Sequence, residues 1–211
     1  MKTVILSGGK PPSLGLLKSE LKECDILIGV DSGGNFLRDQ GIIPDYLVGD
    51  FDSINKENIE YFKLNGSNIY EYPKDKDFTD TELALELAVK LRSDSIVFLG
   101  CTGSRIDHIM GNLGLLRKCI EKEIKGFIKD DHNFIMLSKK PLKLSGNKGK
   151  LFSVQAYCNE INNLTITGAK FPLHNHKLNL GDPITISNEF LEEYVHIDFS
   201  DGIIMIIYPR D

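Results

Sequence analysis

Short apolar runs alternate with amphipathic segments over the first two thirds of the chain. The runs have the length of buried strands, and the segments between them carry apolar residues at helical spacing. Strands that alternate with helices predict an α/β layer fold with a mostly parallel sheet. The candidate strands lie at residues 3–6, 26–30, 46–48, 69–72, 96–99 and 134–137.

Three of the intervening segments predict helices, at residues 55–64, 80–91 and 107–120. Asn55 and Thr79 stand at the starts of the first two as N-caps, and the segment TDTE at 79–82 fits a capping box. Apolar stripes predict which sides of the second and third helices pack in the core. They consist of Leu83, Leu87 and Leu91 on the second helix and of Met110, Leu113 and Leu116 on the third.

After Lys140 and Pro141 the pattern changes to short alternating segments separated by Gly, Asn, Asp and Pro. Alternation of apolar and polar residues is typical of strands with one buried face. The sequence therefore predicts two domains, an α/β domain at residues 1–140 and a smaller all-β domain at residues 141–211.

Composition and charge narrow the classes of function. The chain has 25 basic and 30 acidic residues, which argues against a nucleic-acid surface built on phosphate contacts. The apolar run at the start is too short for a signal peptide, and no run reaches the length of a membrane span. We therefore expect a cytoplasmic protein with neither a membrane nor a nucleic acid as its partner. The cysteines lack metal-site spacing, and we expect buried free thiols at Cys24, Cys101, Cys119 and Cys158.

The segment LVGDFDS places two carboxylates, Asp50 and Asp52, one residue apart directly after an apolar run. In an extended chain successive side chains alternate between faces, so both carboxylates are expected to point the same way. Like charges on one face repel, and a divalent cation such as Mg²⁺ offsets that repulsion. The alternative is a solvated turn after a strand, since Gly49 and Ser53 also favour turns.

A second acidic segment, DKDFTD at residues 75–80, leads into the predicted helix with the capping box. Ordinary helix N-terminal chemistry accounts for Thr79, because a hydroxyl there pairs with unpaired backbone donors. It accounts less well for three aspartates in six residues. We expect Asp80 to supply a third carboxylate facing the metal, beside Asp50 and Asp52.

A third polar segment, residues 100–108, is a glycine-containing turn that opens the third helix. Backbone N–H groups near Gly103 can cradle a phosphate, and the guanidinium of Arg105 can hold its oxygens bidentately. A capped helix start is the alternative. Asp107 has three possible roles: a metal ligand, a partner that orients Arg105, or a simple acidic residue in the first turn of the helix.

Polar loops follow several candidate strands, with DSGG at 31–34, GDFD at 49–52 and CTGSR at 101–105. Ligands of open α/β sheets bind outside the carboxyl ends of the strands. We therefore expect the three loops to share one cleft.

The sequence resembles the thiamine pyrophosphokinase family over nearly its whole length. The matching segments, in family order, are VDSGGNFL, PDYLVGDFDS, DKDFTDTELAL, GSRIDHIMGNL, ITGAKFPLHNHKLNLGDPITISNEF and DGIIMIIYPRD. The resemblance implies a Rossmann-like, three-layer α/β nucleotide-binding domain, a C-terminal β-sandwich, and a homodimer with active sites at the subunit interface. It also implies that ATP and thiamine react, with Mg²⁺, to give AMP and thiamine diphosphate.

The resemblance also implies residue roles. Asp50, Asp52 and Asp80 match the Mg²⁺ site, and Arg105 and Asp107 match a phosphate-handling pair. The expected contacts to the ATP phosphates are Asp31, Gly33, Lys76, Thr79, Gly103 and Arg105, and those to thiamine are Phe171, Ser187 and Asn188. Phe171 stands where the family has Tyr or Trp, Ser104 replaces a common glycine, and the segment SVQA at 153–156 departs from the usual tail.

In the implied reaction the thiamine hydroxyl attacks the β-phosphorus of ATP, while Mg²⁺ and Arg105 neutralise the polyphosphate. Asp107 and Asp80 are both candidates for the general base, and the sequence does not choose between them. One alternative is a phosphatase resembling the haloacid dehalogenases, with Asp50 as the nucleophile, although its later Lys and acidic pair find no match. The other is a non-catalytic module that binds nucleotide or thiamine through the same loops.

Overall fold

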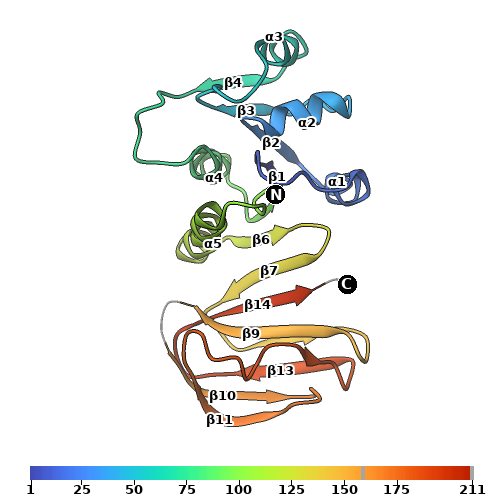
Figure 1. Cartoon of the computed structure of the whole chain (residues 1–211), viewed down its shortest axis with the longest axis vertical. Helices are drawn as coiled ribbons and strands as arrows, with labels where there is room; N and C mark the ends of the chain where they lie inside the picture. Colours follow the sequence, from blue (N-terminus) through green and yellow to red (C-terminus); the bar gives the residue numbers. More distant parts are fainter. Residues whose placement is uncertain (158–159, 210–211) are drawn as a thin grey trace. The chain divides into compact units, whose positions relative to one another are not determined.

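The computed structural model describes residues 1–157 and 160–209 and divides the chain into two compact units, Met1–Asp131 and His132–Asp211 (Figure 1). The elements of the first unit alternate strictly between strand and helix until the last strand. They are β1 (Lys2–Leu6), α1 (Leu14–Leu21), β2 (Ile26–Val30), α2 (Gly33–Asp39), β3 (Tyr46–Gly49), α3 (Lys56–Leu64), β4 (Asn68–Glu71), α4 (Asp80–Lys90), β5 (Ser95–Leu99), α5 (Ile106–Glu121) and β6 (Lys125–Lys129).

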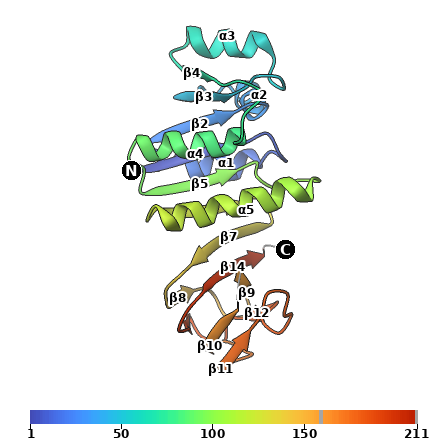
Figure 2. The ribbon, with the colours of Figure 1, turned by 90° about the vertical axis from the view of Figure 1, so that its left-hand side faces the viewer.

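The sheet of the first unit has the strand order β6-β5-β1-β2-β3-β4, and its neighbouring strands pair in parallel. Helices α1 and α2 lie on one face of this sheet, and α4 and α5 lie together on the other (Figures 1 and 2). Because both faces are covered, the central strands are mostly apolar, and Val4, Ile5 and Leu6 of β1 are all fully buried. The expected three-layer α/β architecture is therefore present.

The strands expected in the first unit form within one or two residues of their predicted ends, but α1, α2 and β6 were not predicted. Helix α1 is short, and α2 opens with two glycines, which are poor helix formers. Both helices are held by burial of Leu17 and Leu37 against the sheet. Tertiary packing, which local propensity does not contain, therefore decides these elements.

The predicted core stripes of the helices are partly wrong. Met110 of α5 is 61% exposed, and the buried side of that helix begins only at Leu115 and Leu116. On α4 the buried residues include Ala84 and Leu85 in addition to Leu87. Ala84 and Ala88 are fully buried, so counting only large apolar residues misses part of the buried face, which also includes Leu85.

The second unit consists of strands among its described residues. They are β7 (Asn133–Ser138), β8 (Leu142–Ser145), β9 (Leu151–Tyr157), β10 (Ile161–Thr167), β11 (Leu173–Leu178), β12 (Asn188–Glu189), β13 (Tyr194–Asp198) and β14 (Ile203–Pro209). One antiparallel sheet has the order β12-β9-β14-β7 and the other β11-β10-β13-β8. Val154 and Ile206 of the first sheet share one core with Ile166 and Ile197 of the second, so the unit is a β-sandwich.

The boundary between the units differs from the expected one at 140/141. Strand β7 pairs with β14 along its whole length, from Asn133 opposite Pro209 to Ser138 opposite Ile204. The division therefore falls before β7, between Asp131 and His132. The sequence could not show this, because the partner of β7 lies at the far end of the chain.

Two further expectations concern cysteines and membranes. Cys24, Cys101 and Cys119 are free; Cys101 and Cys119 are buried, whereas Cys24 is only partly so, and Cys158 lies outside the described residues. Burial raises the pKa of the Cys101 thiol to about 12. Within the described ranges, no helix has both the length and the apolar character needed to cross a membrane.

A buried ion triad ties α1 to two strands of the first sheet. Glu20 of α1 is 7% exposed, and its carboxylate accepts hydrogen bonds from Lys2 Nζ at 3.0 Å and from Lys129 Nζ at 2.7 Å. Burial opposes ionisation of Glu20, but the hydrogen bonds from Lys129 and Lys2 outweigh it and lower its pKa below the ordinary value of 4.5.

We expect Glu20→Gln to lower the free energy of unfolding by about 2 kcal/mol at neutral pH, because Lys2 and Lys129, both partly buried, lose their ion pairs with the Glu20 carboxylate. Since the folded-state pKa of Glu20 is depressed, this stabilisation is present above pH 4.5 and is lost as the pH falls through the lower folded-state value. Urea denaturation of both proteins across acidic pH measures the difference. As a control, Glu121→Gln removes an exposed pair with Arg117 and should change stability by less than about 0.5 kcal/mol. Equal effects of the two changes would contradict this role of the triad.

Candidate active site

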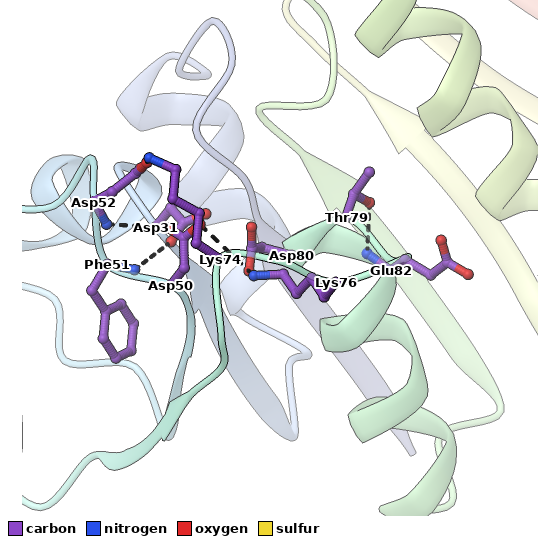
Figure 3. Close-up of polar contacts among 9 residues, drawn as sticks. All are labelled: Asp31, Asp50, Phe51, Asp52, Lys74, Lys76, Thr79, Asp80 and Glu82. Atoms are coloured by element: carbon purple, nitrogen blue, oxygen red, sulfur yellow. Dashed lines mark hydrogen bonds and ion pairs between the residues drawn. The ribbon is translucent and has the colours of Figure 1, made fainter.

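Three carboxylates from different parts of the first unit meet at the carboxyl edge of its sheet. Asp31 follows β2, Asp50 follows the neighbouring strand β3, and Asp80 is the first residue of α4. Each offers an oxygen, and these oxygens all lie within 4.8 Å of one another (Figure 3). We call this group the carboxylate cluster.

Backbone geometry places Asp31 in the cluster. Its own backbone takes a positive φ of 44°, and its N–H donates to Val48 O at 3.1 Å, so the chain turns sharply as it leaves β2. The N–H of Phe51 in turn donates to Asp31 Oδ1 at 3.3 Å. A Cβ atom at position 49 would lie 1.8 Å from Asp31 Oδ1, so Gly49 is needed for this close approach.

The side chains of Asp50 and Asp52, expected on one face, have different surroundings, although the N–H of Asp52 donates to Asp50 Oδ1 at 3.1 Å. Strand β3 ends at Gly49, and Phe51 takes a left-handed φ of 59°, so the alternation of an extended chain does not continue. Asp52 is half exposed and its Oδ2 accepts a hydrogen bond from Lys74 Nζ at 2.7 Å, apart from the cluster (Figure 3). The structure thus brings Asp31, and not Asp52, to Asp50 and Asp80.

Asp80 is fixed by the start of α4. Thr79 is the N-cap, and its hydroxyl accepts from the N–H of Glu82 at 3.2 Å, which confirms this part of the predicted capping box (Figure 3). Beneath this turn, the buried hydroxyls of Thr81 and Ser7 lie 2.9 Å apart and join α4 to the end of β1. Asp80 therefore sits on a helix end anchored to the central strand.

Burial and charge crowding act together in the cluster. Burial raises the pKa of Asp31 to about 7, and the charges of Asp80 and Asp50 act in the same direction. Lys76 offsets part of the negative charge, with its Nζ 2.8 Å from Asp80 Oδ1 and 3.8 Å from Asp50 Oδ2. Three crowded carboxylate oxygens are the donor set of a hard divalent cation, so these residues fit Mg²⁺.

The predicted phosphate-handling pair forms at the start of α5. Arg105 is the N-cap residue of this helix, and its guanidinium donates to both carboxylate oxygens of Asp107, at 2.5 and 3.2 Å. This hydrogen bonding lowers the pKa of Asp107 to about 2. Both side chains are about two-thirds exposed, so the guanidinium and its partner face solvent.

The sequence analysis missed the loop that follows β1, residues 7–10. The N–H of Gly9 donates to Gly100 O and that of Lys10 to Thr102 O, both at 2.8 Å, which joins this loop to the turn before α5. On its other side, a Cβ at Gly33 would lie 2.4 Å from Leu6 O, so α2 begins in close contact with β1. The signal was a Ser-Gly-Gly-Lys sequence directly after an apolar run.

In the second unit, two of the three residues expected near thiamine, Phe171 and Asn188, are hydrogen-bonded to each other. The side-chain amide of Asn188 accepts from Phe171 N at 3.1 Å and donates to Phe171 O at 2.8 Å, while Asn188 itself is 3% exposed. The Phe171 ring is the exposed member, at 54% for the residue. Ser187 takes a positive φ of 55°, and its N–H donates to Ser153 Oγ at 3.0 Å. Asn188 therefore positions Phe171 rather than facing solvent.

Comparisons with known proteins match both units. The model of the thiamin pyrophosphokinase catalytic domain matches residues 17–128, and that of the thiamin pyrophosphokinase vitamin B1 binding domain matches residues 139–204. Thiamine pyrophosphokinase of Bacillus subtilis is 35% identical over the whole of both chains. The chain belongs to the thiamine pyrophosphokinase family.

Solved structures of the thiamine pyrophosphokinase family share the fold over the full chain. The Bacillus subtilis enzyme aligns with a TM-score of 0.90 at 32% identity, covering all of both chains. The Geobacillus thermodenitrificans protein aligns with a TM-score of 0.85 at 29% identity, covering all of this chain and 98% of the other. The carboxylate cluster lies in the range that matches the catalytic domain, and Phe171 lies in the range that matches the vitamin B1 binding domain.

A large surface pocket of about 1030 Å³ lies within the second unit, lined by residues that include Met136, Leu144 and Tyr208. It contains Glu189 but neither Phe171 nor Ser187. The crowded carboxylates lie in the carboxylate cluster of the first unit and not in this pocket.

We expect Gly49→Ala to lower the free energy of unfolding by about 1–3 kcal/mol, because the added methyl group would overlap Asp31 Oδ1 and force the turn apart. The same substitution at Gly111 of α5, where an added methyl group would meet no atom within 4 Å, should instead add about 0.5–1 kcal/mol through helix propensity. Urea denaturation of the two variants tests both signs, and a neutral Gly49→Ala would show that Asp31 is not held as described.

Proposed function

We propose that this protein transfers the pyrophosphoryl group of ATP to the hydroxyethyl oxygen of thiamine, giving AMP and thiamine diphosphate. The observation that carries the proposal is the carboxylate cluster, built within the range that matches the catalytic domain of the family. Moving a group with several negative charges requires concentrated positive charge, and this cluster is where the chain can hold a divalent cation.

Asp50 and Asp80 hold Mg²⁺ in this proposal, and Asp31 takes the third position that the sequence analysis gave to Asp52. Bound Mg²⁺ supplies charge neutralisation for the phosphate oxygens and keeps the attacking and leaving oxygens in line. The protein's own task is to keep the carboxylate oxygens converged, through Gly49 and the start of α4. Asp52 lies at the edge of the site, where its carboxylate pairs with Lys74.

The ATP phosphates are held by cationic side chains and backbone donors in this proposal. Arg105 exchanges its contact with Asp107 for phosphate oxygens, which it can reach because the pair is exposed. Lys76 adds a second cation. The turn at Gly103 and the start of α2 at Gly33 add backbone N–H groups, while Thr79 supports the site as the cap of α4.

Asp107 is a poor general base as long as its pairing with Arg105 holds its pKa at about 2. In this proposal Arg105 leaves Asp107 for the phosphate oxygens, and that exchange frees the Asp107 carboxylate to accept a proton. Asp80 carries the metal in this proposal, which also weakens it as a base. We infer that the thiamine hydroxyl loses its proton late, after phosphorus attack has begun, and that the proton passes to the Asp107 carboxylate that Arg105 has left or to solvent.

The thiamine site is proposed on the exposed face of Phe171, with Ser187 beside it. An aromatic face attracts a cationic ring, and the nearby carboxylate of Glu189 adds negative charge. Lys170 now makes both contacts, since its Nζ lies 2.7 Å from Glu189 Oε1 and 5.5 Å from the centre of the Phe171 ring. Asn188 acts by positioning Phe171.

We also propose a cytoplasmic homodimer with active sites at the subunit interface. Large apolar side chains that one chain leaves exposed support an interface, among them Ile106 and Met110 of α5 and Ile184 and Ile186 of the second unit. The free thiols of Cys101 and Cys119 agree with a reducing compartment.

The first test is product analysis after incubation of the purified protein with ATP, Mg²⁺ and thiamine. We expect AMP and thiamine diphosphate in equal amounts without ADP. Asp50→Asn should lower turnover roughly 10²- to 10³-fold, because one preorganised charged group is lost. Asp52→Asn should lower it far less, since Asp52 lies outside the cluster.

Three outcomes would contradict parts of this proposal. Inorganic phosphate with a trapped phospho-Asp50 would indicate a phosphatase, and binding of both ligands without any product would indicate a non-catalytic module. A loss of turnover for Asp52→Asn as large as that for Asp50→Asn would indicate that Asp52 belongs to the metal site.

We expect Phe171→Ala to raise the KM for thiamine on the order of 10-fold and to leave the KM for ATP unchanged, because the variant loses the aromatic face for the cation. Steady-state kinetics with each substrate varied in turn measures this. Tyr194→Ala is a matched control, since Tyr194 is also a partly exposed aromatic residue of this unit with a lysine, Lys143, 3.5 Å above its ring. An unchanged KM for thiamine in Phe171→Ala, or an equal rise in both variants, would place thiamine elsewhere.

A further inference from the structure

Lys76 reaches into the carboxylate cluster from the segment that joins β4 to α4. Its side chain is 12% exposed, although it belongs to a stretch, residues 72–79, that forms neither helix nor strand. Its Nζ contacts Asp80 Oδ1 at 2.8 Å and Asp50 Oδ2 at 3.8 Å (Figure 3). The ammonium therefore lies among the oxygens that fit a metal ion.

The contacts of Lys76 are electrostatic without being well-formed hydrogen bonds. Within the part of the chain that the structure describes, the buried atoms Lys76 Nζ and Asp80 Oδ1 have no partner in hydrogen-bond geometry. An ammonium has three directional donors, and leaving them unpaired in a buried place is costly. A metal ion needs only oxygens at the right distance, so these carboxylates suit it better than they suit Lys76.

Lys74, two residues earlier, shows what an ordinary pair on this segment looks like. Its side chain is 76% exposed, and its Nζ donates to Asp52 Oδ2 at 2.7 Å in good geometry. The two lysines thus share a segment and a charge but differ in burial and in hydrogen bonding. Of these two lysines, Lys76 is the one that touches the carboxylate cluster.

We propose that Lys76 is an internal counter-cation that occupies the carboxylate cluster in the metal-free protein and withdraws when the metal enters. Its ammonium offsets the repulsion among Asp31, Asp50 and Asp80 until a divalent ion does so. The two cations compete, because an ammonium left beside a divalent ion would be repelled at a separation of a few ångströms.

Withdrawal of Lys76 has a direct use in the reaction. Its segment is irregular, so the ammonium can move from the carboxylates to the phosphate oxygens that arrive with the metal. The inference rests on the proposed function, since it assumes that the cluster holds the metal. It adds that metal binding and phosphate contact by Lys76 are coupled, because one side chain cannot serve both groups at once.

The test compares Mg²⁺ affinity and turnover in Lys76→Met. Titration calorimetry with Mg²⁺ alone, at mildly alkaline pH so that protons do not replace the lost ammonium, should show binding on the order of 10-fold tighter than in the unaltered protein. Turnover with ATP and thiamine at saturating Mg²⁺ should fall in the same variant, because the phosphate contact is lost. A purely structural role would weaken both properties together.

Two variants complete the comparison. Lys74→Met removes the same charge from the same segment outside the cluster and should change Mg²⁺ affinity little. Lys76→Arg keeps the charge and should not tighten Mg²⁺ binding.

Unchanged or weaker Mg²⁺ binding in Lys76→Met overturns the inference while leaving the metal site intact. Equal tightening in Lys74→Met also overturns it, because the effect would then be one of net charge. If neither the unaltered protein nor Lys76→Met binds Mg²⁺, the metal site fails together with the inference. If the protein binds Mg²⁺ but forms neither AMP nor thiamine diphosphate, the proposed reaction fails while the inference about Lys76 still stands.

Discussion

Repulsion among Asp31, Asp50 and Asp80 is the constraint around which the first unit is arranged. Carboxylate oxygens within 4.8 Å of one another resist being brought together, and burial together with the charges of Asp80 and Asp50 raises the pKa of Asp31. The fold overcomes this repulsion with backbone features that cannot relax independently. Two neighbouring parallel strands end beside each other, Gly49 admits the Asp31 carboxylate, and the capped start of α4 brings Asp80. The stability of the sheet therefore maintains a charge arrangement that is unfavourable by itself.

This arrangement explains why cations recur at the edge of the sheet. Lys76 and Lys74 come from one irregular segment and face Asp50 and Asp52 respectively, so each acidic residue of the GDFD loop has a lysine. The left-handed turn at Phe51 gives the two pairs different surroundings, one exposed and the other enclosed. Lys74 and Asp52 are exposed and form a surface pair that solvent and salt screen. Lys76 lies in an enclosed position among carboxylates, where another cation can compete with it.

Sequence reasoning found the features that depend on local pattern. Strands β1 to β5 of the first unit, the start of α4 at Thr79 and the acidic segments all follow from composition and spacing. It failed where a backbone angle or a partner distant in sequence determines the position of a residue or strand. The choice of Asp31 over Asp52 depends on φ at Phe51 and on the adjacency of β2 and β3, neither of which is written in LVGDFDS. Strand β7 was assigned to the wrong unit for the same reason, since its partner β14 ends the described chain.

The departures from the family pattern fall mostly in the second unit, and the structure gives a physical reason why they are tolerated there. Ser153 belongs to the atypical segment 153–156, yet its hydroxyl accepts the N–H of Ser187 and so supports that loop directly. Phe171 is likewise held through its backbone, by the buried amide of Asn188, which leaves its ring free to vary. A side chain held in this way can change without moving its neighbours. The carboxylate cluster has no such freedom, because a shift of any one carboxylate alters the charge balance of the other two. Under the proposed function, variation is therefore expected around the thiamine site at Phe171, while the proposed metal site depends on the geometry of the sheet edge.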